Sequence, residues 1–449
     1  MQLPSCFRLL PALLAGGIVL SGCYSREDMQ GETATSPPAT TEAPTSAATP
    51  AAAATNGPLA LVNVFLEVSG SMEGFMPKTG ADAQNTQFQQ HVAEFLSDLN
   101  GQTLVQRKAF YRIKEKPYRD SYQQLSQTVR GGIREPASST SIPAILDTLV
   151  SHYYQPNTVS VLISDFIYAP PRTGDQAYVK TDITDALRDT QRPDLGVSVY
   201  GFTSDFHGAF YPAVKTGARK INGCCDTAIP YYFWVIGPKD AVRRFDAALL
   251  ARQPGQQAHF GLQFPAPDAS LLNKFQNKGA WYYGDAGASK RAAGATYHTV
   301  AVQSVSAQEP VEFVVGLDLQ RLPDLYRDPS YLKSNLQLTG QDTDAKIVGV
   351  FTATDQTRAS SGAEHQYTHF VKVRLTKMAR AARPLQLTLQ SRRPAWVGQW
   401  TTRNDSNINQ VGAKTFAFSS LLDGVEVVTT NGQSQPPIFA IPLTLQPGQ

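Results

Sequence analysis

Leu59–Val68, which reads LALVNVFLEV, is the most informative stretch of this chain for its fold. A nearly continuous apolar run of this length predicts a central strand buried on both faces, which is typical of parallel sheets. Gln87–Leu99 follows with apolar residues at helical spacing, and Thr158–Ser164 (TVSVLIS) is a second buried strand. Strands and helices then alternate as far as residue 250. This pattern predicts a doubly wound α/β sheet over residues 59–250.

Polar residues follow both buried strands. Glu67 ends the first run and is followed by Ser69 and Ser71, while Asp165 comes directly after the second run. Thr140 lies in a polar loop just before another helical stretch. Ligand sites in open α/β sheets lie outside the carboxyl ends of the strands. Carboxylate and hydroxyl oxygens are hard ligands of the kind that Mg²⁺ prefers.

This order of residues resembles a von Willebrand factor A-type domain, and the resemblance covers about residues 59–250. It implies a metal-ion-dependent adhesion site for Mg²⁺, or for Mn²⁺ or Ca²⁺. Ser69, Ser71 and Thr140 would supply hydroxyl groups, and Glu67 and Asp165 would supply carboxylates. Such a site binds an exposed carboxylate of a protein partner, and the resemblance implies no catalytic residue.

Three residues depart from the family pattern: Glu67 stands in place of Asp, and Ser139 and Phe166 stand where Gly is common. Two alternatives to the binding function therefore stay open. One is a metal-assisted hydrolase of envelope polymers, with Asp165 and Glu67 as its acid and base. The other is a structural envelope protein whose site is degenerate and free of metal.

The N-terminus has the pattern of an export signal. Residues 1–22 predict a lipoprotein signal peptide, because an apolar run from Leu9 to Leu20 is too short to span a bilayer. Leu20-Ser21-Gly22-Cys23 resembles the bacterial lipobox, which implies a lipid on Cys23. Residues 23–58 predict a disordered linker rich in Ala, Thr, Pro and Ser. We therefore expect a lipid-anchored protein of the bacterial cell envelope, and Tyr24 favours the outer membrane.

Residues 251–449 predict a second unit. Short apolar runs separated by Gly, Pro, Asp and Asn are typical of an all-β sandwich, and Thr415–Ser419 and Val425–Thr429 are among its expected strands.

The cysteines admit one intramolecular pairing. Of the four, Cys6 leaves with the signal peptide and Cys23 takes the lipid, so only Cys224 and Cys225 remain. An oxidising compartment favours a vicinal disulfide between them, and free or intermolecular thiols are the alternative.

Composition narrows the class of partner. Lys and Arg number 40 against 37 Asp and Glu, giving a net charge of +3, so nucleic acid is not an expected partner. The sequence also has no Gly-rich phosphate loop and no Gly-x-Ser-x-Gly elbow. We therefore expect a binding protein and not an enzyme.

Overall fold

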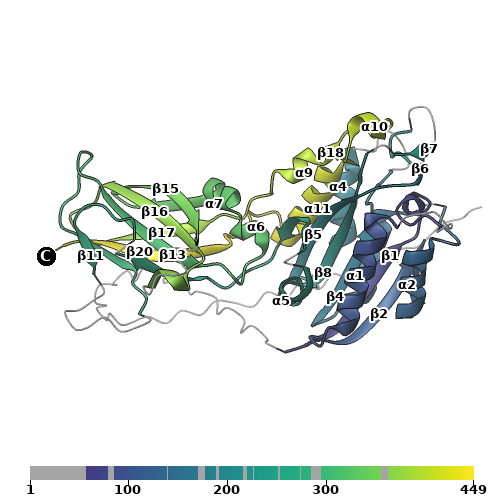
Figure 1. Ribbon diagram of the computed structural model, residues 1–449, viewed down its shortest axis with the longest axis horizontal. Helices are drawn as coiled ribbons and strands as arrows, with labels where there is room; N and C mark the ends of the chain where they lie inside the picture. The colour runs from purple at the N-terminus through teal and green to yellow at the C-terminus, as the bar shows by residue number, and fades with distance from the viewer. Residues whose placement is uncertain are drawn as a thin grey trace, which may run out of the picture. The chain divides into compact units, whose positions relative to one another are not determined.

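The computed structural model describes the chain from Gly57 onward, apart from short internal stretches and the last residue (Figure 1). The described residues are 57–78, 85–138, 140–169, 177–188, 192–215, 220–225, 227–250, 253–273, 275–284, 295–354 and 363–448. The predictions of a signal peptide, a lipidated Cys23 and a linker up to residue 56 lie outside them. Among the described residues, no helix combines the length and apolar character needed to span a bilayer.

A seven-stranded sheet with the order β3-β2-β1-β4-β8-β5-β9 forms the core of the first folded part. Its strands are β1 (Leu59–Glu67), β2 (Val105–Ile113), β3 (Pro117–Asp120), β4 (Thr158–Ser164), β5 (Leu195–Ser204), β8 (Ile229–Pro238) and β9 (Gln256–Phe260). β1 lies between β2 and β4 and is parallel to both. Its residues from Val62 to Glu67 are all buried, which agrees with its apolar sequence. The mixed α/β class is confirmed.

The expectation of a doubly wound sheet holds for only part of these strands. β8 lies between β4 and β5 and is antiparallel to both, and β9 is antiparallel to β5. The reason is the connection after β5, which consists of the short hairpin β6 (Gly208–Phe210) and β7 (Ile221–Cys224). A parallel neighbour needs a crossover, usually a helix, and the described residues between β5 and β8 form none. The chain therefore returns into the sheet at the end of the sheet where β5 finished, so β8 runs antiparallel to β5.

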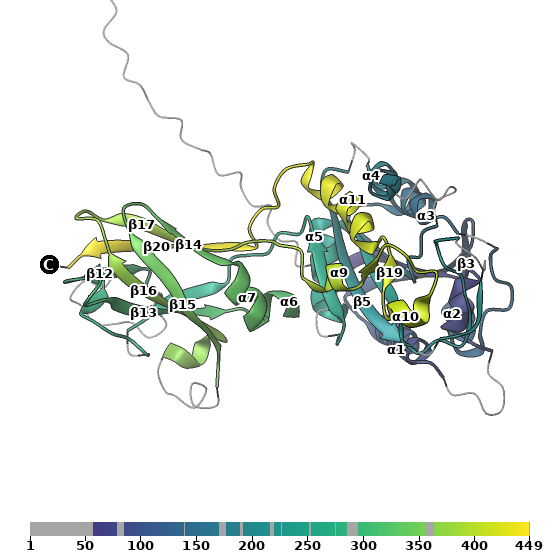
Figure 2. The ribbon, with the colours of Figure 1, turned by 90° about the horizontal axis from the view of Figure 1, so that it is seen from above.

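Helices cover both faces of this sheet (Figures 1 and 2). On one face are α1 (Gln87–Gly101), α2 (Tyr122–Gly131) and α5 (Lys239–Phe245), and on the other are α3 (Ile142–Thr148), α4 (Val179–Leu187) and α11 (Phe418–Thr430). Side chains of β1 alternate between them: Val64 and Leu66 join the core under α1, and Phe65 joins the core under α3. Both faces of β1 are therefore buried.

Helix α1 begins one residue after Thr86, where the sequence predicts it. The Thr86 hydroxyl accepts a hydrogen bond from the Gln89 amide at 3.1 Å, and the Gln89 side chain accepts one from the Thr86 amide at 3.0 Å. This reciprocal capping satisfies two amide groups that the first helical turn leaves without partners.

The second folded part contains two sheets that share one hydrophobic core, as a sandwich does. One sheet has the order β10-β13-β16-β15 and the other β11-β12-β20-β17-β14. Their strands are β10 (Asp268–Leu272), β11 (Trp281–Tyr283), β12 (Thr299–Val302), β13 (Val311–Asp318), β14 (Leu336–Gly340), β15 (Asp344–Thr352), β16 (His369–Lys377), β17 (Arg383–Leu389) and β20 (Phe439–Pro447). All pairs are antiparallel except β12 with β20.

Residues 396–430, here called the C-terminal arm, differ from the expected second unit. They form α9 (Trp396–Gln399), β18 (Thr401–Thr402), α10 (Ile408–Val411), β19 (Thr415–Phe416) and α11. Most of the arm's buried apolar side chains join the core of the seven-stranded sheet, so the α/β part is discontinuous in sequence. Of the two expected strands, Thr415–Ser419 is confirmed only at Thr415–Phe416, which form β19, and Val425–Thr429 is wrong because it lies in α11. Its buried residues Phe418, Leu421, Leu422 and Val425 have helical spacing.

Candidate functional site

The loop after β1 is fixed by a short bridge to the segment that precedes α3. The amide of Gly70 donates to the carbonyl of Ala137 at 3.2 Å, and the amide of Ala137 donates to the carbonyl of Val68 at 2.8 Å. Thr140, three residues after Ala137, thereby lies alongside the end of β1. Ser141 then caps α3 by accepting a hydrogen bond from the Ala144 amide.

Glu67 is buried at the end of β1 and binds two hydroxyl groups. Thr140 donates to one carboxylate oxygen, Oε1, and Ser164, the last residue of β4, donates to the other, Oε2. Ser164 also accepts a hydrogen bond from the amide of Phe166 at 2.9 Å. Sequence reasoning did not single out Ser164, although its place at the end of the second buried strand is a usable signal. Glu67 therefore ties together three segments of the chain.

Asp165 is buried next to this group. Its Oδ1 accepts a hydrogen bond from the Ile167 amide at 3.0 Å, and its Oδ2 is buried without a hydrogen-bond partner among the described residues. Burial first, and then the charge of Glu67, raise the pKa of Asp165 to about 7, against the effects of the Ser71 hydroxyl and the Ile167 amide. The Ser71 hydroxyl lies 2.9 Å from that of Ser69. The five residues named from the sequence therefore lie together.

Phe166 has a left-handed backbone conformation, which a glycine adopts without strain. Its φ is 53°, in the left-handed region that a residue with a Cβ adopts at a cost. Its ring is fully buried and stacks on Trp234, with ring centroids 4.3 Å apart and planes 18° apart. Aromatic packing offsets the backbone cost at this position.

Two residues beside the site come from distant parts of the chain. Asp405, in the C-terminal arm, accepts hydrogen bonds from the amides of Ala213 and Val214 at 2.7 and 3.0 Å. Burial raises the pKa of Asp405, and its charge contributes to the raised pKa of Asp165. Tyr211 precedes these amides, and a Cβ placed on Gly70 would lie 3.5 Å from its ring. No local sequence pattern signals either residue.

Cys224 and Cys225 are joined by a disulfide at the end of β7. The amide of Cys225 donates to the carbonyl of Phe206 at 3.1 Å, and the amide of His207 donates to the carbonyl of Gly74 at 2.8 Å. The hairpin that carries the two cysteines is thus attached to the segment that follows Ser71.

The donor set is suited to a hard cation. The described residues contain no group of three or more His, Cys, Asp or Glu side chains arranged to hold a metal ion. The site itself has two carboxylates and several hydroxyls, so the neutral hydroxyl groups outnumber the carboxylates. Asp165 has one buried oxygen without a partner, whereas both oxygens of Glu67 are engaged by hydroxyls. Asp165 is therefore the direct carboxylate ligand that the arrangement offers, and Glu67 orients Thr140.

A second buried polar cluster lies elsewhere in the sheet. The Ser198 hydroxyl donates to Asp246 and lies 2.8 Å from Nδ1 of His259. Burial raises the pKa of Asp246 to about 7 and lowers that of His259 to about 3. All three side chains are buried, and serine contacts both partners. This order differs from a catalytic triad, in which histidine stands between the serine and the acid.

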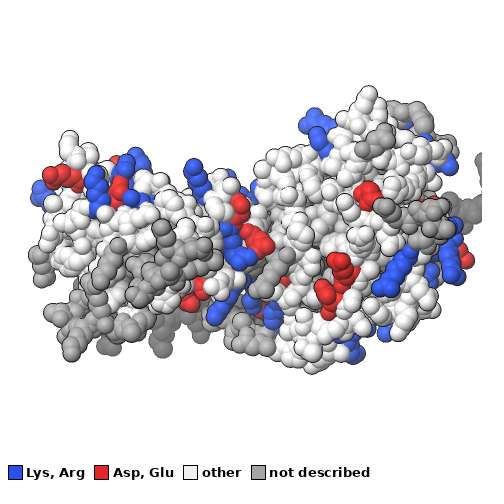
Figure 3. All heavy atoms as spheres, viewed as in Figure 1, with Lys and Arg blue, Asp and Glu red and all other residues white. Residues whose placement is uncertain are grey.

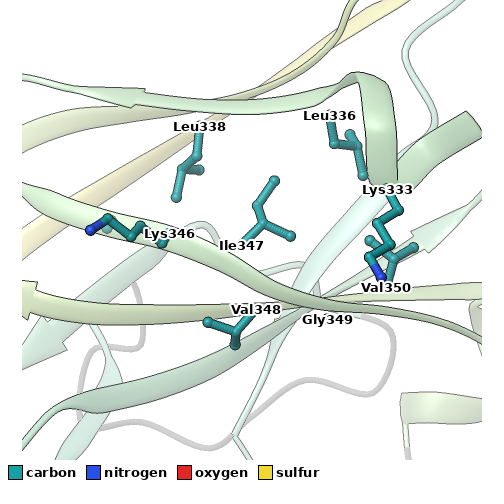
Figure 4. A pocket seen from close by; sticks show the side chains of 9 residues that line it. Lys333, Leu336, Leu338, Lys346, Ile347, Val348, Gly349 and Val350 are labelled. Atoms are coloured by element: carbon teal, nitrogen blue, oxygen red, sulfur yellow. The ribbon is translucent and has the colours of Figure 1, made fainter.

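Neither Glu67 nor Asp165 lines any of four open cavities in the described part of the chain. One, of about 470 Å³, lies between the edge strands β14 and β15 (Figure 4). Leu336, Leu338, Ile347 and Val350 line it, with Lys333 and Lys346 at its rim. Figure 3 shows scattered acidic and basic side chains on one face of the molecule.

Comparison with protein-family models, curated proteins and solved structures finds no match for this chain.

Proposed function

We propose that this chain is a lipid-anchored cell-envelope protein that binds a protein partner through a divalent cation, Mg²⁺ or a similar ion. The proposal gives Ser69, Ser71, Thr140 and Asp165 the role of ligands, with Glu67 behind them. The partner would contribute an exposed carboxylate to the ion. The observation that carries the proposal is the buried Oδ2 of Asp165, which has no hydrogen-bond partner among the described residues, beside the linked hydroxyls of Ser69 and Ser71.

The chemistry supports binding more than catalysis. Mg²⁺ accepts oxygen ligands and keeps open positions, and neutral hydroxyls leave the ion electron-poor. An external carboxylate then completes its coordination. The hydrolase alternative needs one free acid and one free base, whereas both oxygens of Glu67 already accept hydrogen bonds. The alternative of a metal-free structural protein is decided by the experiment below.

Isothermal titration with Mn²⁺, followed by manganese electron paramagnetic resonance, tests the site. We expect one ion per chain, and at least a 10-fold weaker affinity in the double variant Ser69→Ala, Ser71→Ala. Ser151→Ala is a matched control. Ser151 is exposed in the turn that follows α3, and its hydroxyl donates a hydrogen bond to Asp147 in α3, away from the proposed ligands. Unchanged affinity in the double variant would refute the proposed ligands. Failure of the native chain to bind Mn²⁺ would favour the structural alternative.

A further inference from the structure

An open cavity of about 480 Å³ lies between α1, β5 and the start of the C-terminal arm. One wall is a face of α1 that carries Gln87, Gln90, His91 and Glu94, residues at helical spacing. Opposite it is the loop that leads into β9, with Gln253 and Gln256. A cavity of this size is in the range of small-ligand sites.

Aromatic side chains provide the apolar part of the lining. Phe202 and Tyr231 lie in the lining with rings 5.4 Å apart and nearly parallel, and Trp400 of the C-terminal arm is half-buried at the edge. Trp400 approaches β5 closely because Gly201 has no side chain, and a Cβ there would lie 3.1 Å from the Trp400 ring. Gly201 therefore has a specific role in admitting the indole to this cavity.

The polar part of the lining consists mainly of neutral amides. Gln87, Gln90 and Gln256 are exposed, and each amide offers donors and an acceptor. His91 presents a buried Nε2 without a hydrogen-bond partner among the described residues, while its Nδ1 lies 2.8 Å from the Tyr231 hydroxyl. Burial lowers the pKa of His91 to about 4, against the effect of the Gln253 side chain, so the ring is neutral near pH 7. Glu94 is the single charged residue in this lining.

We propose that this cavity binds a neutral pyranose residue of a glycan. Such a ring has an apolar face that packs on an indole and a rim of hydroxyls that both donate and accept hydrogen bonds. The exposed amides of Gln87, Gln90 and Gln256 match that rim. Among the described residues that line the cavity there is no Lys or Arg. The inference goes beyond the proposed metal-dependent function and uses none of its residues.

Titration of the native chain with cellobiose and with di-N-acetylchitobiose tests the proposal, by calorimetry and by saturation-transfer NMR. We expect a dissociation constant on the order of 1 mM for at least one of the two. The double variant Gln90→Ala, Gln256→Ala changes only exposed side chains and should weaken binding at least 10-fold. Gln399→Ala is the matched control, because Gln399 is exposed beside Trp400 and outside the lining. Binding of the sugar should also change the Trp400 fluorescence, which Trp400→Phe removes.

Failure of both disaccharides to bind, or unchanged affinity in the double glutamine variant, would overturn the proposal. Binding of a polyamine such as spermidine that Glu94→Gln abolishes, without sugar binding, would also overturn it in favour of a cationic ligand. The double variant Ser69→Ala, Ser71→Ala should leave sugar affinity unchanged. This measurement distinguishes failure of the proposed sugar site from failure of the proposed metal site.

Discussion

Thr140 donates a hydrogen bond from its hydroxyl to the carboxylate of Glu67, across two segments that are far apart in the chain. The side chain of Glu67 is longer than the aspartate of the A-type pattern, and its carboxylate accepts the hydrogen bond from Thr140. Glu67 also holds Ser164, so the carboxylate spans the ends of two neighbouring strands.

The charge of Glu67 should act on Asp165. In Glu67→Gln the carboxylate charge disappears while the size of the side chain is kept. The pKa of Asp165, about 7 in the native chain, should fall, because the negative charge of Glu67 disfavours ionisation of Asp165. It should stay above the ordinary value, since burial is the larger cause.

Carbon-13 NMR of the Asp165 carboxyl group during a pH titration measures this shift. Glu94→Gln on α1 is the control and should leave the pKa of Asp165 unchanged. An Asp165 pKa that does not move in Glu67→Gln would contradict the electrostatic coupling of the two carboxyl groups.

The positive φ of Phe166 predicts that Phe166→Gly is more stable than Phe166→Ala, which is the reverse of the order expected within a helix. Both Phe166→Ala and Phe166→Gly lose the stacking on Trp234, which costs about 3–5 kcal/mol for a buried aromatic side chain. Glycine also relieves the backbone cost of φ 53°, on the order of 1 kcal/mol. Phe166→Gly should therefore be the more stable variant of the two.

Chemical denaturation followed by circular dichroism measures both variants. Phe95 in α1 supplies the control, because in a helix Phe95→Gly should be about 1 kcal/mol less stable than Phe95→Ala. The same order at both positions would refute the role of backbone strain at Phe166.

Asp405 should hold the loop that contains Ala213 and Val214. Asparagine has one acceptor oxygen in place of two, so Asp405→Asn leaves one of the two amides facing an NH₂ group. We expect a loss of about 1–3 kcal/mol of stability and faster hydrogen exchange at one of these amides. Asp423→Asn is the control in the same arm, because Asp423 pairs with Arg393 instead. Unchanged exchange in Asp405→Asn would contradict the anchoring role.

Asp246 makes the stability depend on pH. Its pKa is about 7 in the folded chain against 3.8 without burial, so between these values the folded state binds more protons than the unfolded state. The free energy of unfolding then falls as pH rises from about 4 to 7, on the order of 1 kcal/mol per pH unit. Asp246→Asn removes this dependence. The free energy of unfolding of Asp246→Asn minus that of the native chain should therefore increase between pH 5 and pH 8.

Denaturation curves at several pH values measure that difference. His259 acts in the opposite direction, because its lowered pKa costs stability as pH falls below its ordinary value of 6.5. Since both proteins contain His259, its effect largely cancels in the comparison. A difference between the two proteins that is independent of pH would show that Asp246 is ionised alike in both states.

Cys23 should carry the lipid. Expression of the full chain in a bacterium with labelled palmitate should label the native protein and the variant Cys6→Ser, because Cys6 belongs to the predicted signal peptide. Cys23→Ser should lose the label and leave the membrane fraction. Labelling of Cys23→Ser, or none of the native chain, would rule out this anchor.

The sequence predicts the features that depend on neighbours along the chain. β1, β4 and α1 follow from apolar runs and helical spacing, because burial on both faces or on one face leaves a local pattern. The five proposed site residues also follow, since the ends of adjacent parallel strands meet at one edge of a sheet. These features occupy short stretches in which the pattern is complete.

Packing between distant segments sets the remaining features. The antiparallel place of β8 depends on the hairpin before it and on which strand edge is free. α11 contains β-branched residues that favour a strand, and its helix forms where Phe418 and Leu422 can be buried against the sheet. Asp405 joins the site by contacts that no local pattern encodes, because its partners come close only after the chain has folded.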